Sequence, residues 1–489
     1  LEKEGALDSK YGFYEAVDYT RRRVGRKAAV IQSHMAHHVG MSIAGAANLL
    51  KDNICSKLFL SDERIKRAEE LSEEKVMAGE KILNSDPNQI EERFPKEKEE
   101  IKEQRLFCSP INSLSGGSLS LFTSANGMFK GVYKGVSTVN GCTDSRSYID
   151  RPHGAFYGFC DGSEIYPFFY HPKFKIKPST VFSESETVYK SEEKGLVLEM
   201  RVRAEHNAEI RTFGVKNKSR TKKQLTLCLY SEPTLAAEAD YSAHPMFMDL
   251  FLKIEYDKEN KLFVFYRKER DGNKVTACAA GFSEEDADFT YCFSKEACLG
   301  SSPFSFFDKA LLRECYDRAI PSPCLFVKDD MTVDAGETKK ITFFYCYADS
   351  AEEAKKAALR LRSRGGELKE NFAPSPLSLS TVHGRIASLT LPALLYGETE
   401  EETILNARKE NRLGKNALWG YSISGDYPLL IAKAEEAKTM VLLKQGLDRC
   451  GVKSELIILC ENGLEKSAAE GDLICLLYTS PSPRDRTRS

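Results

Sequence analysis

Two carboxylates stand among aromatic side chains near the start of the chain, in the segment Tyr11-Gly-Phe-Tyr-Glu-Ala-Val-Asp-Tyr-Thr. The acids are Glu15 and Asp18, and Tyr14 directly precedes Glu15. Aromatic faces pack on sugar rings, while carboxyl groups bind hydroxyls or protonate a glycosidic oxygen. Glycosyl transfer needs two such carboxyl groups flanking one bond. The segment therefore favours sugar chemistry, and an ordinary surface Glu on an aromatic-rich turn is the alternative that its residues leave open.

A group of three histidines follows in Ser33-His-Met-Ala-His-His-Val-Gly-Met. The i, i+3, i+4 spacing of His34, His37 and His38 predicts that they share one face of a helix. A metal site would need a carboxylate or further ligands that this spacing does not supply. We therefore expect a polar stripe lining a groove, and no metal.

The fourteen cysteines form no CxxC pair, and several lie inside apolar runs, such as Cys228 and Cys346. Reduced cysteines behave in this way as small core hydrophobes, whereas a structural zinc site needs clustered pairs. The spacing thus predicts free thiols and a reducing compartment.

The elements that must position these residues can be outlined from composition. A length of 489 residues suggests about three domains, and 42% hydrophobic residues suffice for large cores. The net charge of −2 excludes a strongly basic nucleic-acid-binding protein. The longest apolar runs are far short of the ~20 residues of a membrane helix. The chain opens without Met or a signal peptide, so we expect it to begin within a longer protein.

Changes of pattern along the sequence predict a multidomain α+β protein. Residues 1 to about 105 have a helical composition, divided into helices over 1–82 and a charged linker over 83–111. Period-two alternation over 112–350, as in Leu196-Val-Leu-Glu-Met-Arg-Val-Arg, predicts a large antiparallel β-sandwich. Residues 351–475 predict linker helices and a small α/β piece, with Ser350 or Asp349 capping the first helix. Residues 476–489, rich in Ser, Pro and Arg, have the composition of a non-native tail; a genuine disordered basic tail is the alternative.

The first segment, YGFYEAVDYT…SHMAHHVGM, resembles the end of the middle domain of the cyclic β-1,2-glucan synthases, where the stretch is close to YGFYEAIDYT…SFMAHHQGMS. That domain is a glucoamylase-like α/α barrel that carries out transglycosylation. The resemblance implies that Glu15 is one of a catalytic carboxylate pair, with Tyr14, Asp18, His37 and His38 at the glycan. Val39 replaces the family's Gln, which removes one polar sugar contact. The partner carboxylate would lie upstream of Leu1.

The predicted sandwich resembles a second module of the same synthases, the N-terminal domain of the glycoside phosphorylases formerly grouped as glycosyltransferase family 36. The resemblance rests on the segments beginning at Leu119, Glu209 and Ser231. The family's Arg-Trp pair is missing, and we interpret Asp144, Arg146 and His153 as polar residues of hairpin loops. A third segment, Leu418-Trp-Gly-Tyr-Ser-Ile-Ser-Gly-Asp-Tyr-Pro, resembles the family's LWGYGISGDLPI signature. It nominates Trp419 and Asp426 as substrate contacts, and a packing motif is at least as well supported.

These resemblances imply a fragment of an enzyme that synthesises, cyclises or trims β-1,2-glucan by transglycosylation and phosphorolysis. They imply a glucan partner, inorganic phosphate as co-substrate and no cofactor. They also imply a homodimer through the sandwich as one arrangement, and a cytoplasmic-side location in a parent anchored at the inner membrane. Because neither barrel would be complete, we expect the chain alone to be inactive. Two alternatives remain open: a stand-alone phosphorylase of the cellobiose phosphorylase type, and a non-catalytic carbohydrate-binding or assembly module.

Overall fold

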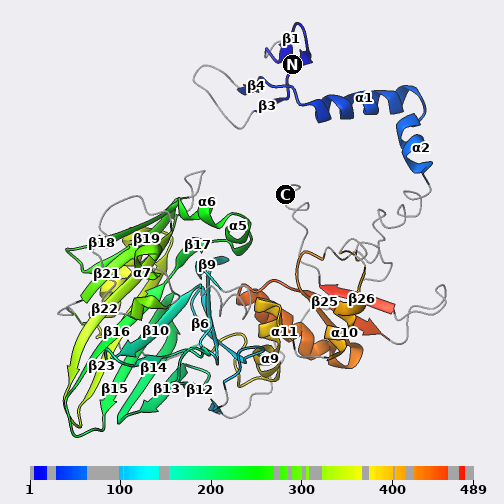
Figure 1. Ribbon diagram of the computed structural model, residues 1–489. Coiled ribbons are helices and arrows are strands. Elements are labelled where there is room, and N and C mark those ends of the chain that lie inside the picture. The colour runs from blue at the N-terminus through cyan, green and yellow to red at the C-terminus, as the bar shows by residue number, and fades with distance from the viewer. Residues whose placement is uncertain are drawn as a thin grey trace. The chain divides into compact units, whose positions relative to one another are not determined.

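The structure is a computed structural model of the 489-residue chain (Figure 1). It describes residues 5–18, 29–62, 98–102, 104–141, 153–268, 275–284, 289–299, 304–307, 322–365, 374–399, 402–412, 425–460 and 473–478, together with 414, 418 and 423. The chain divides into two compact units. Unit 1 comprises Leu1–Ala78 and Leu413–Gly425, and unit 2 comprises Gly79–Arg412 and Asp426–Ser489.

Unit 1 contains two short antiparallel hairpins followed by two helices. The first hairpin pairs β1 (Leu7–Asp8) with β2 (Gly12–Phe13), and the second pairs β3 (Ala16–Asp18) with β4 (Ala29–Ile31). Helices α1 (Ala36–Leu50) and α2 (Ile54–Leu60) contain no buried residue. The prediction of helices from residue 1 onward is therefore wrong for the described residues 5–18 and 29–31. Gly5 and Gly12 have positive φ angles of 72° and 87°, which favour turns over a helix at these positions.

Unit 2 contains the predicted antiparallel sandwich, which is confirmed. Its largest sheet has nine strands in the order β18-β19-β20-β23-β15-β14-β13-β12-β5. The strands are β5 (Glu99–Ile101), β12 (Ser179–Phe182), β13 (Thr187–Glu193), β14 (Leu196–Glu205), β15 (Ala208–Asn217), β18 (Leu252–Asp257), β19 (Leu262–Lys268), β20 (Val275–Phe282) and β23 (Thr338–Ala348). The strand β5 lies within the predicted linker 83–111, and its pairing with β12 corrects that prediction. Its Glu- and Lys-rich neighbourhood gives no alternation by which a strand could be recognised.

Two five-stranded sheets pack against the nine-stranded sheet around a common apolar core. One has the order β11-β10-β16-β22-β21 and the other β17-β9-β8-β7-β6. Their strands are β6 (Ile111–Gly116), β7 (Leu119–Ser124), β8 (Phe129–Tyr133), β9 (Val136–Val139), β10 (Ala155–Cys160), β11 (Ile165–Pro167), β16 (Lys223–Ser231), β17 (Pro233–Ala236), β21 (Phe289–Ser294) and β22 (Pro323–Val333). Two short helices, α5 (Glu238–Ala243) and α6 (Pro245–Asp249), lie between β17 and β18. Helix α7 (Lys295–Leu299) and the 3-10 helix η2 (Ser305–Phe307) lie between β21 and β22.

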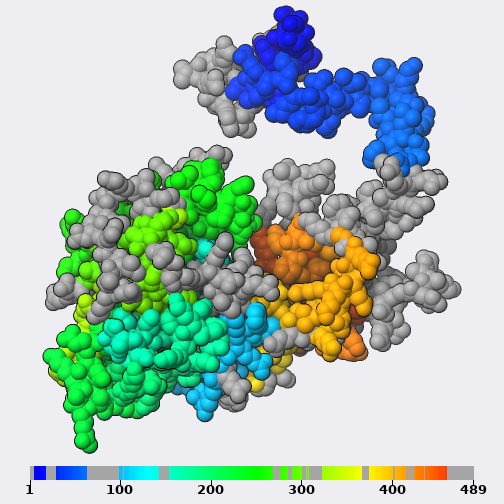
Figure 2. All heavy atoms as spheres, viewed as in Figure 1, coloured from blue at the N-terminus to red at the C-terminus, as the bar shows by residue number. Residues whose placement is uncertain are grey.

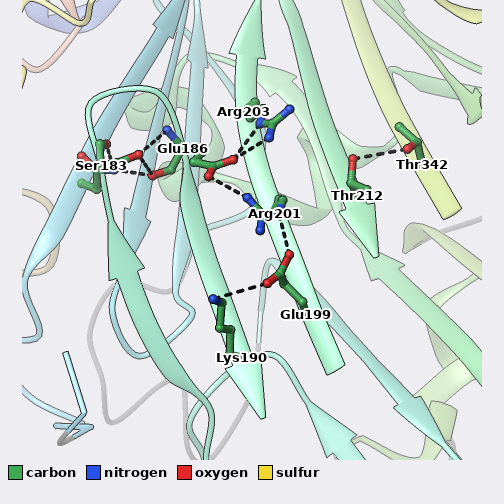
Figure 3. Close-up of polar contacts among 9 residues, drawn as sticks. Ser183, Glu186, Lys190, Glu199, Arg201, Arg203, Thr212 and Thr342 are labelled. Atoms are coloured by element: carbon green, nitrogen blue, oxygen red, sulfur yellow. Dashed lines mark hydrogen bonds and ion pairs between the residues drawn. The ribbon is translucent and has the colours of Figure 1, made fainter. Parts of the chain in front are cut away.

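The two faces of the large sheet differ as the sequence alternation requires. Leu196, Leu198, Met200 and Val202 of β14 are buried in the core, while the residues between them lie on the opposite face. On that face Glu186 lies between Arg201 and Arg203, at 2.8 Å and 2.7 Å between the charged atoms (Figure 3). Burial opposes the charge of Glu186, but the two arginines outweigh it and lower the pKa of this carboxyl group.

A fully buried ion pair lies inside the core. Arg211 and Glu209 are two residues apart on β15, so their side chains share one face of the strand, and their charged atoms are in direct contact. The Arg211 guanidinium also lies over the rings of Tyr157 and Phe129, at 4.1 Å and 4.4 Å from their centroids. Burial opposes its charge, but Glu209 outweighs that effect and raises the pKa of Arg211.

The C-terminal part of unit 2 covers the sandwich with helices. Helix α8 (Ala351–Arg362) packs on the nine-stranded sheet, and the side chain of Ser350 accepts a hydrogen bond from the Glu353 N–H, which confirms the predicted cap. Helix α9 (Val382–Tyr396) and helix α11 (Ala437–Arg449) share an apolar cluster with Phe122 and other residues of the five-stranded sheets. Figure 2 shows the light-blue residues of the first strands bordering the yellow and orange residues of this segment.

The small α/β piece is also confirmed. Strand β24 (Leu429–Lys433) leads through the 3-10 helix η5 (Ala434–Glu436) and α11 to β25 (Glu455–Cys460), which pairs with it in parallel. Strand β26 (Leu473–Tyr478) pairs antiparallel with β25. The prediction of a non-native tail from residue 476 is corrected for Leu476–Tyr478, which belong to β26 because the apolar run before them continues the strand. Helix α10 (Glu402–Glu410) precedes this piece.

Candidate functional site

Glu15 lies at the junction of the two hairpins of unit 1. It follows β2 and directly precedes β3, and its backbone N–H donates to the Ser33 carbonyl oxygen at 2.9 Å. The neighbouring Tyr14 N–H donates to the Ala6 carbonyl oxygen, also at 2.9 Å. These two bonds fix the backbone of Glu15 between the segment before β1 and the segment that leads into α1.

The Glu15 carboxylate contacts the imidazole of His38. The atoms in contact are Oε1 of Glu15 and Nδ1 of His38, and the pair joins the hairpins to the first turn of α1. The Glu15 side chain is only 11% exposed, whereas that of His38 is 52% exposed. A carboxylate can only accept, so the Nδ1 atom carries the proton when this hydrogen bond forms. The contact thereby orients the carboxyl group.

A cluster of aromatic side chains and an acid, Asp8, lies in the same hairpins. The His34 ring lies 5.1 Å from the Tyr14 ring and 5.7 Å from the Tyr11 ring, measured between centroids. The Tyr14 hydroxyl donates to Asp8 at 3.3 Å. The backbone N–H groups of Tyr11 and Lys10 donate to Asp8 and lower the pKa of its carboxyl group. Unit 1 thus places the Asp8 carboxylate beside aromatic rings, a combination of side chains that is suited to sugars.

The three histidines do not share one helical face. His34 precedes α1, which begins at Ala36 after the N-cap residue Met35, so the predicted i, i+3, i+4 arrangement is wrong. The rings of His37 and His38, both exposed, lie 4.0 Å apart. The extended conformation of Met35 is what separates His34 from the helix, and it turns that ring toward the tyrosines instead.

The other predicted site residues are less closely tied to this centre. Asp18 ends β3 and is paired with Ala29, and its side chain lies outside the described residues. Trp419 also lies outside the described residues. Asp426 is exposed and precedes β24, after Gly425, whose φ of 67° fits the turn predicted there. Their roles as substrate contacts stay predictions.

A second polar centre, which sequence reasoning missed, lies in the sandwich. Glu232 links β16 to β17, and its side chain is 4% exposed. Its carboxylate accepts hydrogen bonds from Tyr230, Lys295 and Asn140 at 2.8, 2.9 and 2.9 Å, and His153 Nδ1 lies 3.4 Å away. Burial opposes the charge of Glu232, but His153 and Lys295 outweigh it and lower the pKa of this carboxyl group. We call these five residues the Glu232 centre.

Helices α5 and α6 bring a further acid close to the Glu232 centre. The Tyr241 hydroxyl donates to Asp249 at 3.0 Å. Burial, supplemented by the negative charge of Glu232, raises the pKa of Asp249 to about 6. The Arg267 guanidinium donates to the carbonyl oxygens of Thr234 and Met248, which anchors α6 to β17. The only sequence signal for this centre was an acid placed directly after a long apolar strand, at Ser231-Glu-Pro.

Among the residues that the structure describes, no group of three or more His, Cys, Asp or Glu side chains is arranged to hold a metal ion. Within the same residues, no helix is long and apolar enough to cross a membrane. The cysteines described are free thiols, and most of them are buried.

Comparison with known proteins relates the chain to carbohydrate-active enzymes. Residues 156–364 match the family model of the glycosyl hydrolase 94 supersandwich domain. The chain is 24% identical over 501 aligned residues to the cyclic beta-(1,2)-glucan synthase NdvB of Rhizobium meliloti (strain 1021). This alignment covers 94% of the chain but only 17% of that protein. The expected resemblance to these synthases and to the phosphorylase-type sandwich is thereby confirmed.

Two solved structures show a limited likeness to the chain. A bacterial glucoamylase complexed with acarbose is 12% identical, with a TM-score of 0.35. The match covers 59% of this chain and 37% of the glucoamylase chain. A galactose mutarotase-like protein from Clostridium acetobutylicum is 10% identical, with a TM-score of 0.31. The match covers 52% of this chain and 99% of the mutarotase-like chain.

Proposed function

We propose that the chain works on a β-1,2-linked glucan as part of a glycosyl-transferring enzyme. The observation that carries this proposal is the alignment with a cyclic β-(1,2)-glucan synthase, which extends over 94% of the chain. The match of residues 156–364 to a glycosyl hydrolase family supports the same class of substrate. The aromatic and carboxylate composition around Glu15 is suited to that substrate.

Glu15 is the group that we propose for the transfer step. When protonated, its carboxyl group donates a proton to the glycosidic oxygen as the bond to the anomeric carbon breaks. When ionised, it attacks that carbon or stabilises the positive charge that develops on the sugar. His38 orients the carboxyl group in either case. The reaction requires a second carboxyl group on the other side of the bond, and the position of that group decides which role Glu15 takes.

The proposal extends to the co-substrate and the cellular location that the resemblance to the synthases and phosphorylases implies. Inorganic phosphate would be the acceptor in phosphorolysis by the enzyme of which this chain is a part. The location would be the cytoplasmic side of the inner membrane. The free buried thiols, such as Cys228 and Cys346, are compatible with a reducing compartment.

Isothermal titration calorimetry with linear β-1,2-glucan oligosaccharides tests the proposal, with cello-oligosaccharides of the same length as the comparison. We expect saturable binding of the β-1,2-linked chains and at least tenfold weaker binding of the β-1,4-linked chains. Glu15→Gln should weaken binding about tenfold or more, because a hydrogen bond to a charged group contributes about 1.5–3 kcal/mol.

Glu192→Gln is the matched control, since Glu192 is an exposed acid whose partner is Lys218. This variant should bind as the unaltered chain does. If the chain does not bind linear β-1,2-glucan, or binds both linkages equally, the proposed substrate is wrong. If Glu15→Gln binds as tightly as the control, the substrate assignment stands but Glu15 is not at the glycan.

A further inference from the structure

The Glu232 carboxylate is fully used within the protein. Three donors bond to its two oxygens at 2.8–2.9 Å, and His153 is the fourth neighbour. An ionised carboxyl group offers about four acceptor positions, so Glu232 has no remaining capacity for a ligand. The carboxylate instead holds the surrounding side chains in position, above all the two that extend toward the solvent.

Those two groups are His153 and Lys295. Their side chains are 36% and 23% exposed, whereas Glu232 beneath them is 4% exposed. Lys295 Nζ lies 3.1 Å from His153 Nδ1, although the two residues are 142 positions apart in the chain. His153 precedes β10, and Lys295 is the first residue of α7. The buried acid therefore holds an ammonium group and an imidazole together at the surface, where each alone would be mobile.

An acceptor, Asp249 of α6, lies near the same region. Asp249 is close enough to feel the charges of both Glu232 and Lys295, and its neighbour Tyr241 offers a half-buried aromatic ring. Arg267, the other cation nearby, is bonded to backbone carbonyl oxygens. The formal charges of Glu232, Asp249, Lys295 and Arg267 cancel when both acids are ionised. A site with donors, an acceptor, an aromatic ring and no net charge suits a neutral polyhydroxyl ligand and does not attract an anion.

We propose that His153 and Lys295, positioned by Glu232, form a sugar-binding subsite in the sandwich that is separate from Glu15. The Lys295 ammonium donates its remaining hydrogen to one hydroxyl oxygen of a pyranose unit, the His153 imidazole provides a second polar contact, and Asp249 accepts from another hydroxyl. Glu232 is a positioning residue and does not touch the sugar. That the sugar is a unit of the β-1,2-glucan rests on the proposed function, whereas the location of the subsite does not.

The test uses the full chain in a Glu15→Gln background, so that any binding at the first site is reduced. Sophorose, the β-1,2-linked glucose disaccharide, is titrated and binding is followed by calorimetry. We expect Lys295→Met and His153→Gln each to weaken sophorose binding by tenfold or more, since each removes a polar contact from the sugar. Lys134→Met is the control, because Lys134 is an exposed lysine that likewise pairs with an acid, Asp349, at 2.6 Å. It should leave binding unchanged.

A second variant protects the test against loss of folding, since removing Lys295 leaves the buried Glu232 without its cation. Lys295→Arg keeps the charge beside Glu232 but places the donors differently, and it should stay folded by circular dichroism while binding sophorose more weakly. The histidine ring resonances in a two-dimensional spectrum give an independent readout. Those of His153, assigned by their loss in His153→Gln, should shift on addition of sophorose.

The positioning role of Glu232 has its own signature. Glu232→Gln should weaken sophorose binding, and the double variant Glu232→Gln/Lys295→Met should lose less affinity than the two single losses added together, because both changes act on the Lys295 contact. Independent, additive losses would contradict the positioning role. Unchanged binding in folded Lys295→Arg and His153→Gln, together with unshifted His153 resonances, would overturn the subsite.

The outcomes also separate this inference from the proposed function. If cellobiose binds the Glu232 centre as tightly as sophorose and both respond to Lys295→Met, the subsite stands and the β-1,2 assignment falls. If linear β-1,2-glucan binding depends on Glu15 alone and is indifferent to Lys295 and His153, the proposed function stands and the subsite is wrong.

Discussion

The two units hold their chemistry-bearing side chains in different ways. In unit 1, Glu15 is fixed by hairpin strands of two and three residues and by one contact to α1, a helix in which no residue is buried. In the sandwich, Glu232 lies beneath the surface and is bonded by side chains from a strand, a loop and a helix. Both are acids beside a histidine, but only the second is surrounded by a packed core.

This difference shows that a clear sequence motif and a firmly packed site are separate properties. The segment around Glu15 has a dense sequence motif, so its candidate residues can be identified from the sequence. It has few stabilising contacts, so only a few interactions hold its side chains in place. The Glu232 centre has almost no local motif and many contacts. A site supported by packed strands is held more precisely than a site on short hairpins. Substitutions in the sandwich core should therefore cost far more stability than substitutions on the surface of unit 1.

The largest effect should come from the buried ion pair of the sandwich core. Arg211→Met leaves the Glu209 carboxylate buried without its partner, and breaking such a pair costs about 3–5 kcal/mol. Urea unfolding followed by far-UV circular dichroism measures the loss. Arg201→Met is the control on the outer face of the sheet, where Arg201 is one-third exposed, and it should cost no more than about 1 kcal/mol. An equal loss of unfolding free energy in the two variants would contradict the distinction between the buried core and the outer face of the sheet.

A slightly smaller effect is expected for an apolar core residue. Leu198 is fully buried in β14, and Leu198→Ala should lower the free energy of unfolding by about 2–5 kcal/mol through lost burial and a residual cavity. Val197→Ala, one residue earlier and on the opposite face of the strand, should cost much less. Urea unfolding of both variants gives the comparison. A similar loss for the two would mean that both faces of the sheet are equally packed.

The pH dependence of stability tests the electrostatics around Glu232. The pKa of Asp249 is about 6 in the folded chain, above its ordinary value of 3.8, so the folded state binds more protons between these values. Stability from this group is therefore present below about pH 4 and is lost as the pH rises through 6. Because Asp249 is partly exposed, screening limits the effect to about 1 kcal/mol.

Asp249→Asn should remove this contribution and flatten the stability profile between pH 4 and 6. The measurement is the urea midpoint at a series of pH values. Asp334→Asn, on an exposed turn, is the control and should leave the profile unchanged. A profile that keeps its slope in Asp249→Asn would show that another group titrates there. Glu232 has the opposite sign, since its pKa is lowered: the stability that it contributes is present above its unfolded pKa and is lost at lower pH.

The sequence predicts those parts of the fold whose signals are local and repeated. The alternation around Leu198 continues over ten residues in β14, enough for its period to identify the buried face, and Ser350 stands where a cap is needed. It does not predict β5, because that strand is defined by its pairing with β12 rather than by its own residues. The hairpins of unit 1 have strands too short to show any period.

The same reasoning applies to the sites. Glu15 and His38 are 23 residues apart and belong to one motif, so the sequence could nominate both. The Glu232 centre unites Asn140, His153 and Lys295, and the last two are 142 residues apart. No pattern in one sequence links such positions, because only the pairing of strands in three dimensions brings them together. His153 was accordingly interpreted as a loop residue, and only the fold shows the buried acid beside it.

The smallest effect should come from the apolar surface of α1. Leu49 is 86% exposed, so Leu49→Ala removes almost no packing within unit 1 and should change the local stability of α1 by less than about 0.5 kcal/mol. Alanine also has the higher helix propensity, which opposes any loss. Hydrogen exchange of the amides in Ala36–Leu50 measures the effect on this helix directly. The matched variant is Leu198→Ala, the same substitution at a buried position. If Leu49→Ala instead accelerated exchange throughout α1 more than tenfold, the helix would be packed against a surface, and unit 1 would resemble the sandwich in how its site is held.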